Sequence, residues 1–237
     1  MRLDEFFKGL GFIAGSIGAQ VRDSVVQGVP LEELDLTGPA PTKLALLGPP
    51  QVVVKEGEVF RVDIETAPGP DSHEVHFTLE EDRLGIAGGD RDTVVQVTLP
   101  SVAKLTVAGS GRVAADKLAR DGEISIAGSG KLEVAAVDGG KLKVSIAGSG
   151  RLMANGQADE FELSIAGSGS CDAEGLTAEK ASVHIAGSGD AIFTCNGEVS
   201  AHLMGSGNVI VRGSARCSVH SMGSGTVTCE RAAEAAD

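Results

Sequence analysis

The sequence predicts an all-β protein that folds as a single-stranded, right-handed parallel β-helix with coils of about 19 residues. The first observation is that Gly-Ser-Gly recurs seven times in the C-terminal half, at steps of 19, 20, 19, 20, 18 and 18 residues. The second is that apolar and polar residues alternate on both sides of each copy. A fixed period of this length is typical of a solenoid, because one coil alone cannot bury its apolar face. The copies begin at Gly109, Gly128, Gly148, Gly167, Gly187, Gly205 and Gly223.

Each coil is predicted to contain a strand, a Gly-Ser-Gly corner and a second strand. In the coil around Gly128, Ile124 and Ile126 are apolar and Ser125 between them is polar, which is the alternation of a strand with one buried face. The alternation resumes after the motif, with Leu132 as the next apolar residue. Glycine suits the corner because it accepts a positive φ and leaves room for the next coil. The right-handed sense follows from the general preference of parallel crossover connections.

Residues 42–229 are predicted to form the β-helix, with 42–100 as an atypical N-terminal β cap and first coils and 101–229 as the Gly-Ser-Gly coils. Residues 55–58 separate two alternating runs and predict a hairpin. Pro and Gly at 68–71 predict a loop. The strands expected in the cap and first coils are 43–47, 51–55, 59–65, 73–80, 83–87 and 93–99.

Residues 1–41 are predicted as a short amphipathic helix followed by a linker with Pro and Gly. We favour a helix that packs over its own domain. The alternatives are an interfacial helix that contacts a membrane surface through residues 1–21, and an atypical signal cleaved near Ala19. At the other end, the Ala-rich and acidic residues 230–237 predict a frayed or disordered tail. The apolar positions of the helix are Leu3, Phe6, Phe7, Leu10, Ile13, Ala14, Ile17 and Val21.

The composition argues against nucleic-acid binding. The net charge is −13, and the sequence contains neither Trp nor Tyr. A nucleic-acid partner requires a basic surface and benefits from aromatic stacking platforms, so no such partner is expected. The cysteines lack C-x-x-C spacing, and no two occupy the same column of neighbouring coils. Free, mostly buried thiols are therefore predicted at Cys171, Cys195, Cys217 and Cys229.

The leading segment with its Leu99-Pro100 step, the run Leu-Thr-Val-Ala-Gly-Ser-Gly at 105–111 and the repeated coils resemble the putative auto-transporter adhesin head GIN domain, a bacterial domain of unknown function. The resemblance covers about 44–229. It implies a parallel β-helix and a cell-envelope or secreted setting, and it brings no established catalytic residues. The N-terminus lacks the basic region of a secretory signal, so the cytoplasm stays an alternative location.

Two columns of the predicted coils carry candidate chemistry. Three histidines share one strand position in successive coils, so their imidazoles are expected about 5 Å apart on an outward face. Such a ladder could bind a transition metal weakly or respond to pH, but we favour an exposed polar ladder that replaces Thr and Ser. Three bases in a second column could hold an anion, although a structural role is favoured there too. No cofactor is implied. The two columns are His184, His202 and His220, and Arg112, Lys131 and Arg151.

These observations predict a non-enzymatic structural or binding protein with a cell-surface, adhesin-like or assembly role. No catalytic constellation is evident in the sequence. The runner-up is a carbohydrate-active β-helix enzyme, which would need facing carboxylates. A third reading is a weak metal-binding module on the histidine ladder. Because the open ends of a solenoid expose strand edges, the expected partner is a second copy of the chain, joined through the β-helix ends or the N-terminal helix.

Overall fold

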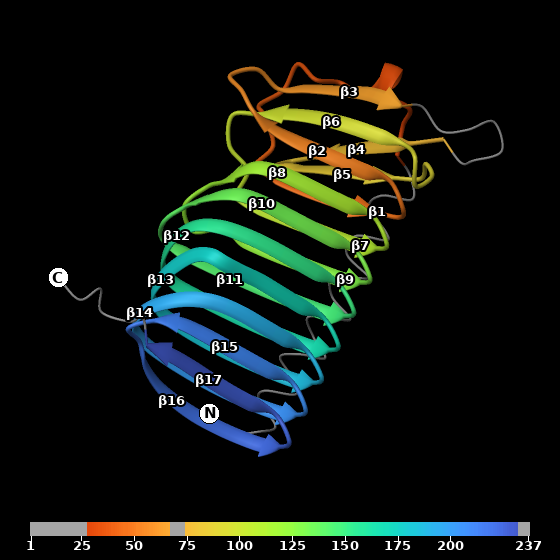
Figure 1. Ribbon diagram of the computed structural model, residues 1–237. Helices are drawn as coiled ribbons and strands as arrows, with labels where there is room; N and C mark the ends of the chain where they lie inside the picture. The colour runs from red at the N-terminus through yellow and green to blue at the C-terminus, as the bar shows by residue number, and fades with distance from the viewer. Residues whose placement is uncertain (1–27, 67–73, 232–237) are drawn as a thin grey trace.

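The protein is a parallel β-solenoid in a computed structural model that describes residues 28–66 and 74–231 (Figure 1). Strands make up most of the described chain, and equivalent strands of successive coils pair in parallel. The all-β solenoid class and the coil of about 19 residues are therefore confirmed. The predicted N-terminal helix, the 68–71 loop and most of the predicted tail lie outside the described residues.

The Gly-Ser-Gly coils are built from two strands that meet at the glycine corner. In the first and last of these coils the strands are separate elements, whereas in β12, β13 and β14 the second strand of one coil continues into the first strand of the next. The separate strands are β7 (Lys104–Gly109), β8 (Arg112–Leu118), β9 (Glu123–Gly128), β10 (Lys131–Asp138) and β11 (Lys141–Gly148). The continuous ones are β12 (Arg151–Gly167), β13 (Ser170–Gly187) and β14 (Asp190–Gly205). The last three are β15 (Asn208–Gly213), β16 (Arg216–Gly223) and β17 (Thr226–Arg231).

Glycine is required at the corners by both backbone conformation and space. The first glycines of the seven motifs have φ between +112° and +129°, a region that other residues avoid. A Cβ on Gly187 would also lie 2.3 Å from the carbonyl oxygen of Gly167 in the preceding coil. The corners are joined along the axis by backbone hydrogen bonds, such as the one that the Ser129 N–H donates to the Gly109 oxygen at 2.9 Å. The motif is therefore a packing element that sets the coil spacing.

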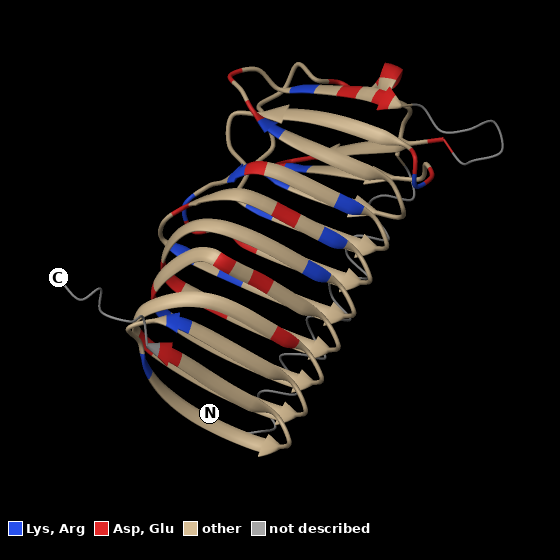
Figure 2. Cartoon of the chain, viewed as in Figure 1, with Lys and Arg blue, Asp and Glu red and all other residues tan. Residues whose placement is uncertain are grey.

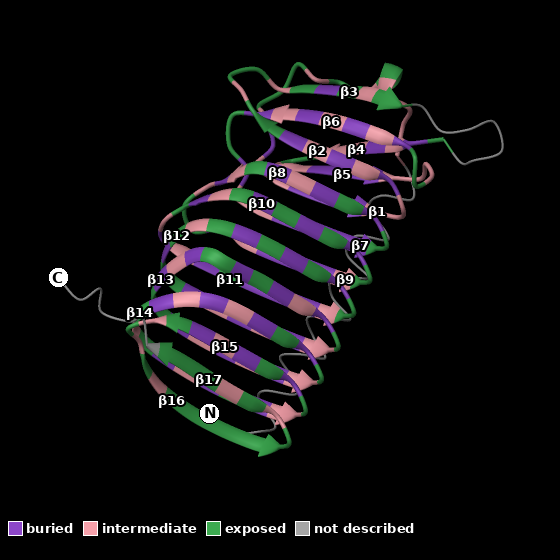
Figure 3. Cartoon of the chain, viewed as in Figure 1, coloured by how far each residue is buried: buried purple, intermediate pink, exposed green. Residues whose placement is uncertain are grey.

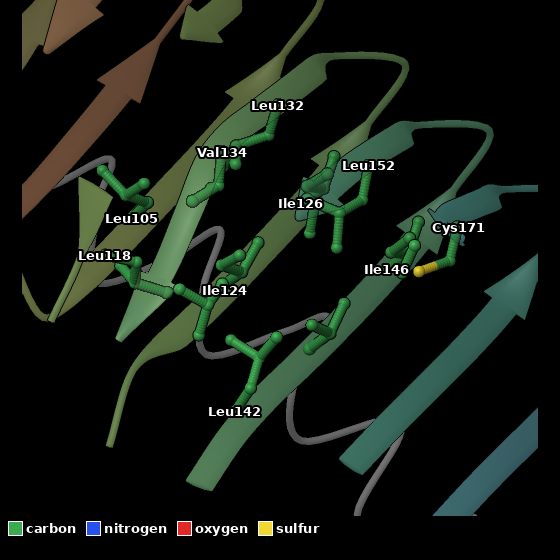
Figure 4. Close-up of a cluster of buried hydrophobic side chains, with 14 of the residues drawn as sticks. Leu105, Leu118, Ile124, Ile126, Leu132, Val134, Leu142, Ile146, Leu152 and Cys171 are labelled. Carbon is green, nitrogen blue, oxygen red and sulfur yellow. The ribbon is translucent and has the colours of Figure 1, made fainter. Parts of the chain in front are cut away.

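The interior is filled by columns of aliphatic side chains that point between the two strands of each coil (Figure 4). Buried and exposed residues accordingly alternate along many of the strands (Figure 3). Leu132, Leu152 and Cys171 occupy one such column in successive coils. The largest buried side chains include three phenylalanines, and the rings of Phe161 and Phe193 make an edge contact at 5.4 Å. A single continuous core therefore runs along the solenoid, as apolar-inward alternation requires.

The N-terminal coils are not stacked in chain order. The first coil in the chain, β1 (Lys43–Leu47) and β2 (Gln51–Glu56), lies between the later coil of β5 (Arg83–Ala87) and β6 (Val94–Leu99) and the coil of β7 and β8. Gly48, with φ +121°, forms its corner. The end is closed by two antiparallel strands, with β3 (Arg61–Thr66) on β6 and β4 (His76–Glu80) on β5. A short 3₁₀ turn, η1 (Leu31–Glu33), precedes them.

The predicted hairpin at 55–58 is wrong. The chain does reverse direction there, but β6 lies between β2 and β3 and pairs with both, in parallel with β2 and antiparallel to β3. The physical reason is that β2 is an inner strand of the solenoid, with β6 on one edge and β8 on the other. No free edge remains for the strand that follows it in the chain.

The prediction of four free thiols is wrong for two of them. Cys217 on β16 and Cys229 on β17 form a disulfide, with Cα atoms 6.8 Å apart. They belong to the same coil and face each other across its interior. The prediction of free thiols rested on equivalent positions in neighbouring coils and did not consider contacts within one coil. The prediction is confirmed for Cys171 and Cys195, which are free and buried. Burial raises the pKa of the Cys171 thiol to about 12, and the nearby Asp172 charge adds to this effect.

Candidate functional site

One outward surface of the solenoid is formed mainly by small side chains, with histidine and methionine in its last coils. We call it the Ser–Ala face and define it by two outward columns on the strands that lead into the corners. From the N-terminal end, the first column is Gly85, Ala45, Thr106, Ser125, Ser145, Ser164, His184, His202 and His220. The second is Ala87, Leu47, Ala108, Ala127, Ala147, Ala166, Ala186, Met204 and Met222.

In the first column of the Ser–Ala face, the residues from Gly85 to Ser145 are buried, and the last coils are more exposed. Thr106, Ser125 and Ser145 are only 5%, 2% and 6% exposed, although they point away from the core. Of the three histidines predicted to form an exposed polar ladder, His202 and His220 are exposed, whereas His184 is half-buried.

The three histidines form a stacked ladder at the exposed end of this face. The rings of His184 and His202 are 5.1 Å apart and inclined by 5°, and those of His202 and His220 are 5.1 Å apart and inclined by 15°. Serines of the adjacent outward column lie beside the rings, with Ser182 Oγ 3.2 Å from His184 Nε2 and Ser200 Oγ 3.3 Å from His202 Nε2. The structure thus brings the predicted ladder together as a parallel stack.

The ladder is arranged for stacking rather than for chelation. Parallel rings direct their nitrogens side by side, and the described residues contain no group of three or more His, Cys, Asp or Glu side chains placed to hold a metal ion. Burial lowers the pKa of His184, and a protonated His202 nearby lowers it further, while Glu162 opposes both effects. Weak metal binding stays a prediction that would require the side chains to rotate.

The three bases of the second predicted column are also stacked. Register pairs Lys131 with Arg112 on one side and with Arg151 on the other, and all three are exposed. Figure 2 shows this run of positive charge on β8, β10 and β12. Arg151 donates a hydrogen bond to Ser170 Oγ at 3.1 Å, but no described carboxylate forms an ion pair with any of the three. Anion binding stays a prediction for this column.

A different charged column, near the return bends, carries charges of both signs. Lys141, Glu160, Lys180, Glu198 and Arg216 follow one another in register, so that their signs alternate from coil to coil. Within it, Lys141 Nζ lies 3.6 Å from Glu160 Oε1. Alternating charges at this spacing support the stacking register. The charged residues near the return bends therefore serve packing, unlike the bases on β8, β10 and β12.

The last coil, β16 and β17, presents an open end that sequence reasoning did not resolve in detail. β16 is exposed along nearly all of its length (Figure 3), and Val219 and Met222 are 43% and 64% exposed. The disulfide joins the two strands of this coil. One sequence signal could have found it, because Cys217 and Cys229 each lie six residues from Gly223, on opposite sides of the corner.

The family model described as "Putative auto-transporter adhesin, head GIN domain" matches residues 40–215. A putative adhesin from Bacteroides fragilis has a TM-score of 0.70 at 17% identity, over 80% of this chain and 92% of that one. A putative adhesin from Parabacteroides merdae gives 0.62 at 18%, over 83% and 93%. A putative lipid binding protein from Parabacteroides distasonis gives 0.58 at 19%, over 82% and 94%. These likenesses show the fold. No curated protein matches the chain.

Proposed function

Because the chain belongs to the family described as "Putative auto-transporter adhesin, head GIN domain", we propose that it is a non-enzymatic, adhesin-like assembly protein of the cell envelope that binds a second copy of itself through its last coil. The observation that carries this proposal is the open end at β16 and β17. β16 pairs with β14, and β17 pairs with β15, on one edge only within the described part of the chain. Their outer edges offer unpaired backbone N–H and C=O groups, which are templates for another strand.

Two features of the last coil suit contact with an identical copy. The sequence carries no Asp, Glu, Lys or Arg between Arg216 and Glu230, although the chain has a net charge of −13. Two such ends can therefore approach without strong repulsion, whereas most of the surface would repel its copy. Edge pairing about a twofold axis would be antiparallel and self-complementary. The Cys217–Cys229 bond holds both strands in place for that pairing.

The same disulfide supports a location in the cell envelope or outside the cell. Disulfides persist in oxidising compartments and are rare in the cytosol. The adhesin family points to the same location. Among the described residues, no helix has the length and apolar character needed to cross a membrane.

The test is the self-association of the full-length, oxidised protein, measured by sedimentation velocity over a concentration series. Val219→Lys places a charge at the centre of the open end and should raise the dimer dissociation constant at least about tenfold, or about 1.4 kcal/mol. The matched control is Val59→Lys at the capped end, where Val59 is 69% exposed, and it should leave association unchanged. A wild-type protein that stays monomeric at every concentration would contradict the proposal, as would equal weakening by both variants.

A further inference from the structure

Three exposed bases form a short row of positive charge across β8, β10 and β12, and Figure 2 shows them in line. In register, Lys131 lies between Arg112 and Arg151, and each of the three side chains is exposed. Because paired strands lie about 4.8 Å apart, the row extends over about 10 Å along the solenoid. It stands on the surface of a protein whose net charge is −13. We call these three residues the basic row.

The basic row departs from the charge pattern of other columns in the solenoid. Opposite charges on neighbouring strands support the register, whereas like charges directly opposite each other are destabilising. Two columns near the return bends follow this rule, because their signs alternate from coil to coil. One of them is Lys104, Glu123, Lys143 and Glu162, and the other begins at Lys141. The register gains nothing from three bases of the same sign, which points to a ligand as the reason for the row.

The charges of the basic row are not neutralised within the described part of the chain. No described carboxylate forms an ion pair with any of the three bases. Glu133 stands two residues after Lys131 on the same strand and does not pair with it. Arg151 donates a hydrogen bond from Nε to the neutral Ser170 Oγ at 3.1 Å, which leaves the other guanidinium N–H groups for a ligand. The row therefore offers its charge to an anion from solution.

Serine hydroxyl groups accompany the basic row on the side of the corners. Ser110, Ser129 and Ser149 are exposed, and each stands two residues before one of the bases. A hydroxyl group both donates and accepts hydrogen bonds, so it suits the hydroxyl groups of a sugar. Each of the three coils thus presents one cation and one hydroxyl group. In the next two coils Ser170 and Asp190 replace the base, so the row ends there.

A linear ligand with repeated anionic groups and hydroxyl groups matches this arrangement. Arginine binds the paired oxygens of an anionic group through two parallel hydrogen bonds, and lysine adds a point charge. Nucleic acids also repeat an anion, but the sequence has neither Trp nor Tyr to stack on bases. We propose that Arg112, Lys131 and Arg151 bind an acidic polysaccharide, whose sulfate or carboxylate groups pair with the bases and whose hydroxyl groups bind the corner serines.

This site is separate from the open end that the proposed self-association uses. The strands β13, β14 and β15 lie between β12, which carries Arg151, and β17 in the last coil. Two copies joined at their last coils would keep both basic rows exposed and would bind one polysaccharide chain with higher avidity than a single copy. Polysaccharide binding does not depend on self-association, and either property can be absent without the other.

The experiment measures binding of the full-length, oxidised protein to dextran sulfate by isothermal titration calorimetry, with uncharged dextran of the same length as the reference polymer. The triple variant Arg112→Ser, Lys131→Ser and Arg151→Ser introduces the residue type of Ser170 in all three coils. It should weaken binding at least about tenfold, because the released counterions of three contacts are lost. The association constant should for the same reason fall less steeply with salt than that of the wild type.

The matched control is the triple variant Lys104→Ser, Lys141→Ser and Lys143→Ser, which changes the net charge by the same amount in columns that contain acids. It should leave binding nearly unchanged, and circular dichroism verifies that both variants are folded. Absence of binding between the wild type and dextran sulfate would overturn the proposal, as would equal weakening by both variants or equal binding to uncharged dextran. Binding only to vesicles of an anionic phospholipid would assign the basic row to a membrane surface and would also overturn it.

Discussion

The two ends of the solenoid differ in their strand pairing (Figure 1). At the N-terminal end, β3 and β4 add antiparallel strands to β6 and β5, so the parallel ladders give way to antiparallel pairing there. At the C-terminal end, β16 and β17 repeat the coil geometry with nothing described beyond them. A solenoid needs an atypical terminal unit to stop stacking. Among the described residues, parallel pairing therefore ends at β5 and β6 on one side and leaves the outer edges of β16 and β17 unpaired on the other.

The largest expected effect comes from a corner glycine inside the solenoid. In Gly148→Ala, the new Cβ would stand 2.6 Å from the Gly128 oxygen at a φ of +114°, so the corner cannot keep its geometry. We expect a loss of about 3 kcal/mol or more in the free energy of unfolding, measured by chemical denaturation. Gly38→Ala is the control, because Gly38 has no atom within 4 Å of its added Cβ. It should unfold like the wild type.

Gly223→Ala makes the same substitution at the corner of the last coil. Its Cβ would stand 2.3 Å from the Gly205 oxygen, a similar clash, but only the last coil has to move to relieve it. The loss should therefore be smaller than that of Gly148→Ala and confined to the open end. Equal losses for both variants would mean that the last coil unfolds together with the rest of the solenoid.

The next effect comes from the disulfide. Replacing Cys217 and Cys229 together by serine removes a link that closes a loop of twelve residues, a change that costs about 2–3 kcal/mol in typical proteins. Because the last coil has a neighbour on one side only, we expect this loss to appear as local opening. Amide hydrogen exchange should accelerate in 216–231 and stay unchanged in β1 and β5. Acceleration along the whole chain would show that the open end is coupled to the capped end.

The smallest effect is the pH response of His184. Its pKa lies below the ordinary value of 6.5 because of burial, so the unfolded chain binds a proton more readily than the folded one. Stability should therefore be complete above pH 6.5 and fall as the pH drops through that value. His184→Ser restores the residue type of Ser164 and should flatten this part of the thermal stability profile. His220→Ser at the exposed end of the ladder is the control, and a larger flattening there would contradict the assignment.

The sequence predicted correctly the features that follow from the repeat of the coils. The strands 43–47 and 83–87 were predicted at their observed bounds, and the histidine and basic columns are stacked as their spacing required. The predictions were wrong for features that depend on tertiary contacts beyond the repeat pattern. The hairpin at 55–58 depended on β6 arriving between β2 and β3, and the Cys217–Cys229 bond depended on contact across one coil.

The sequence by itself determined the path of each coil, because positive φ at the corner glycines and apolar alternation are local requirements. It did not determine the order of the coils at the N-terminal end. Equivalent apolar strands can pair with one another in several orders, and only the tertiary structure places β1 and β2 between two later coils. The tertiary structure also decides which end is closed, because a strand edge is free or covered according to its neighbours in space.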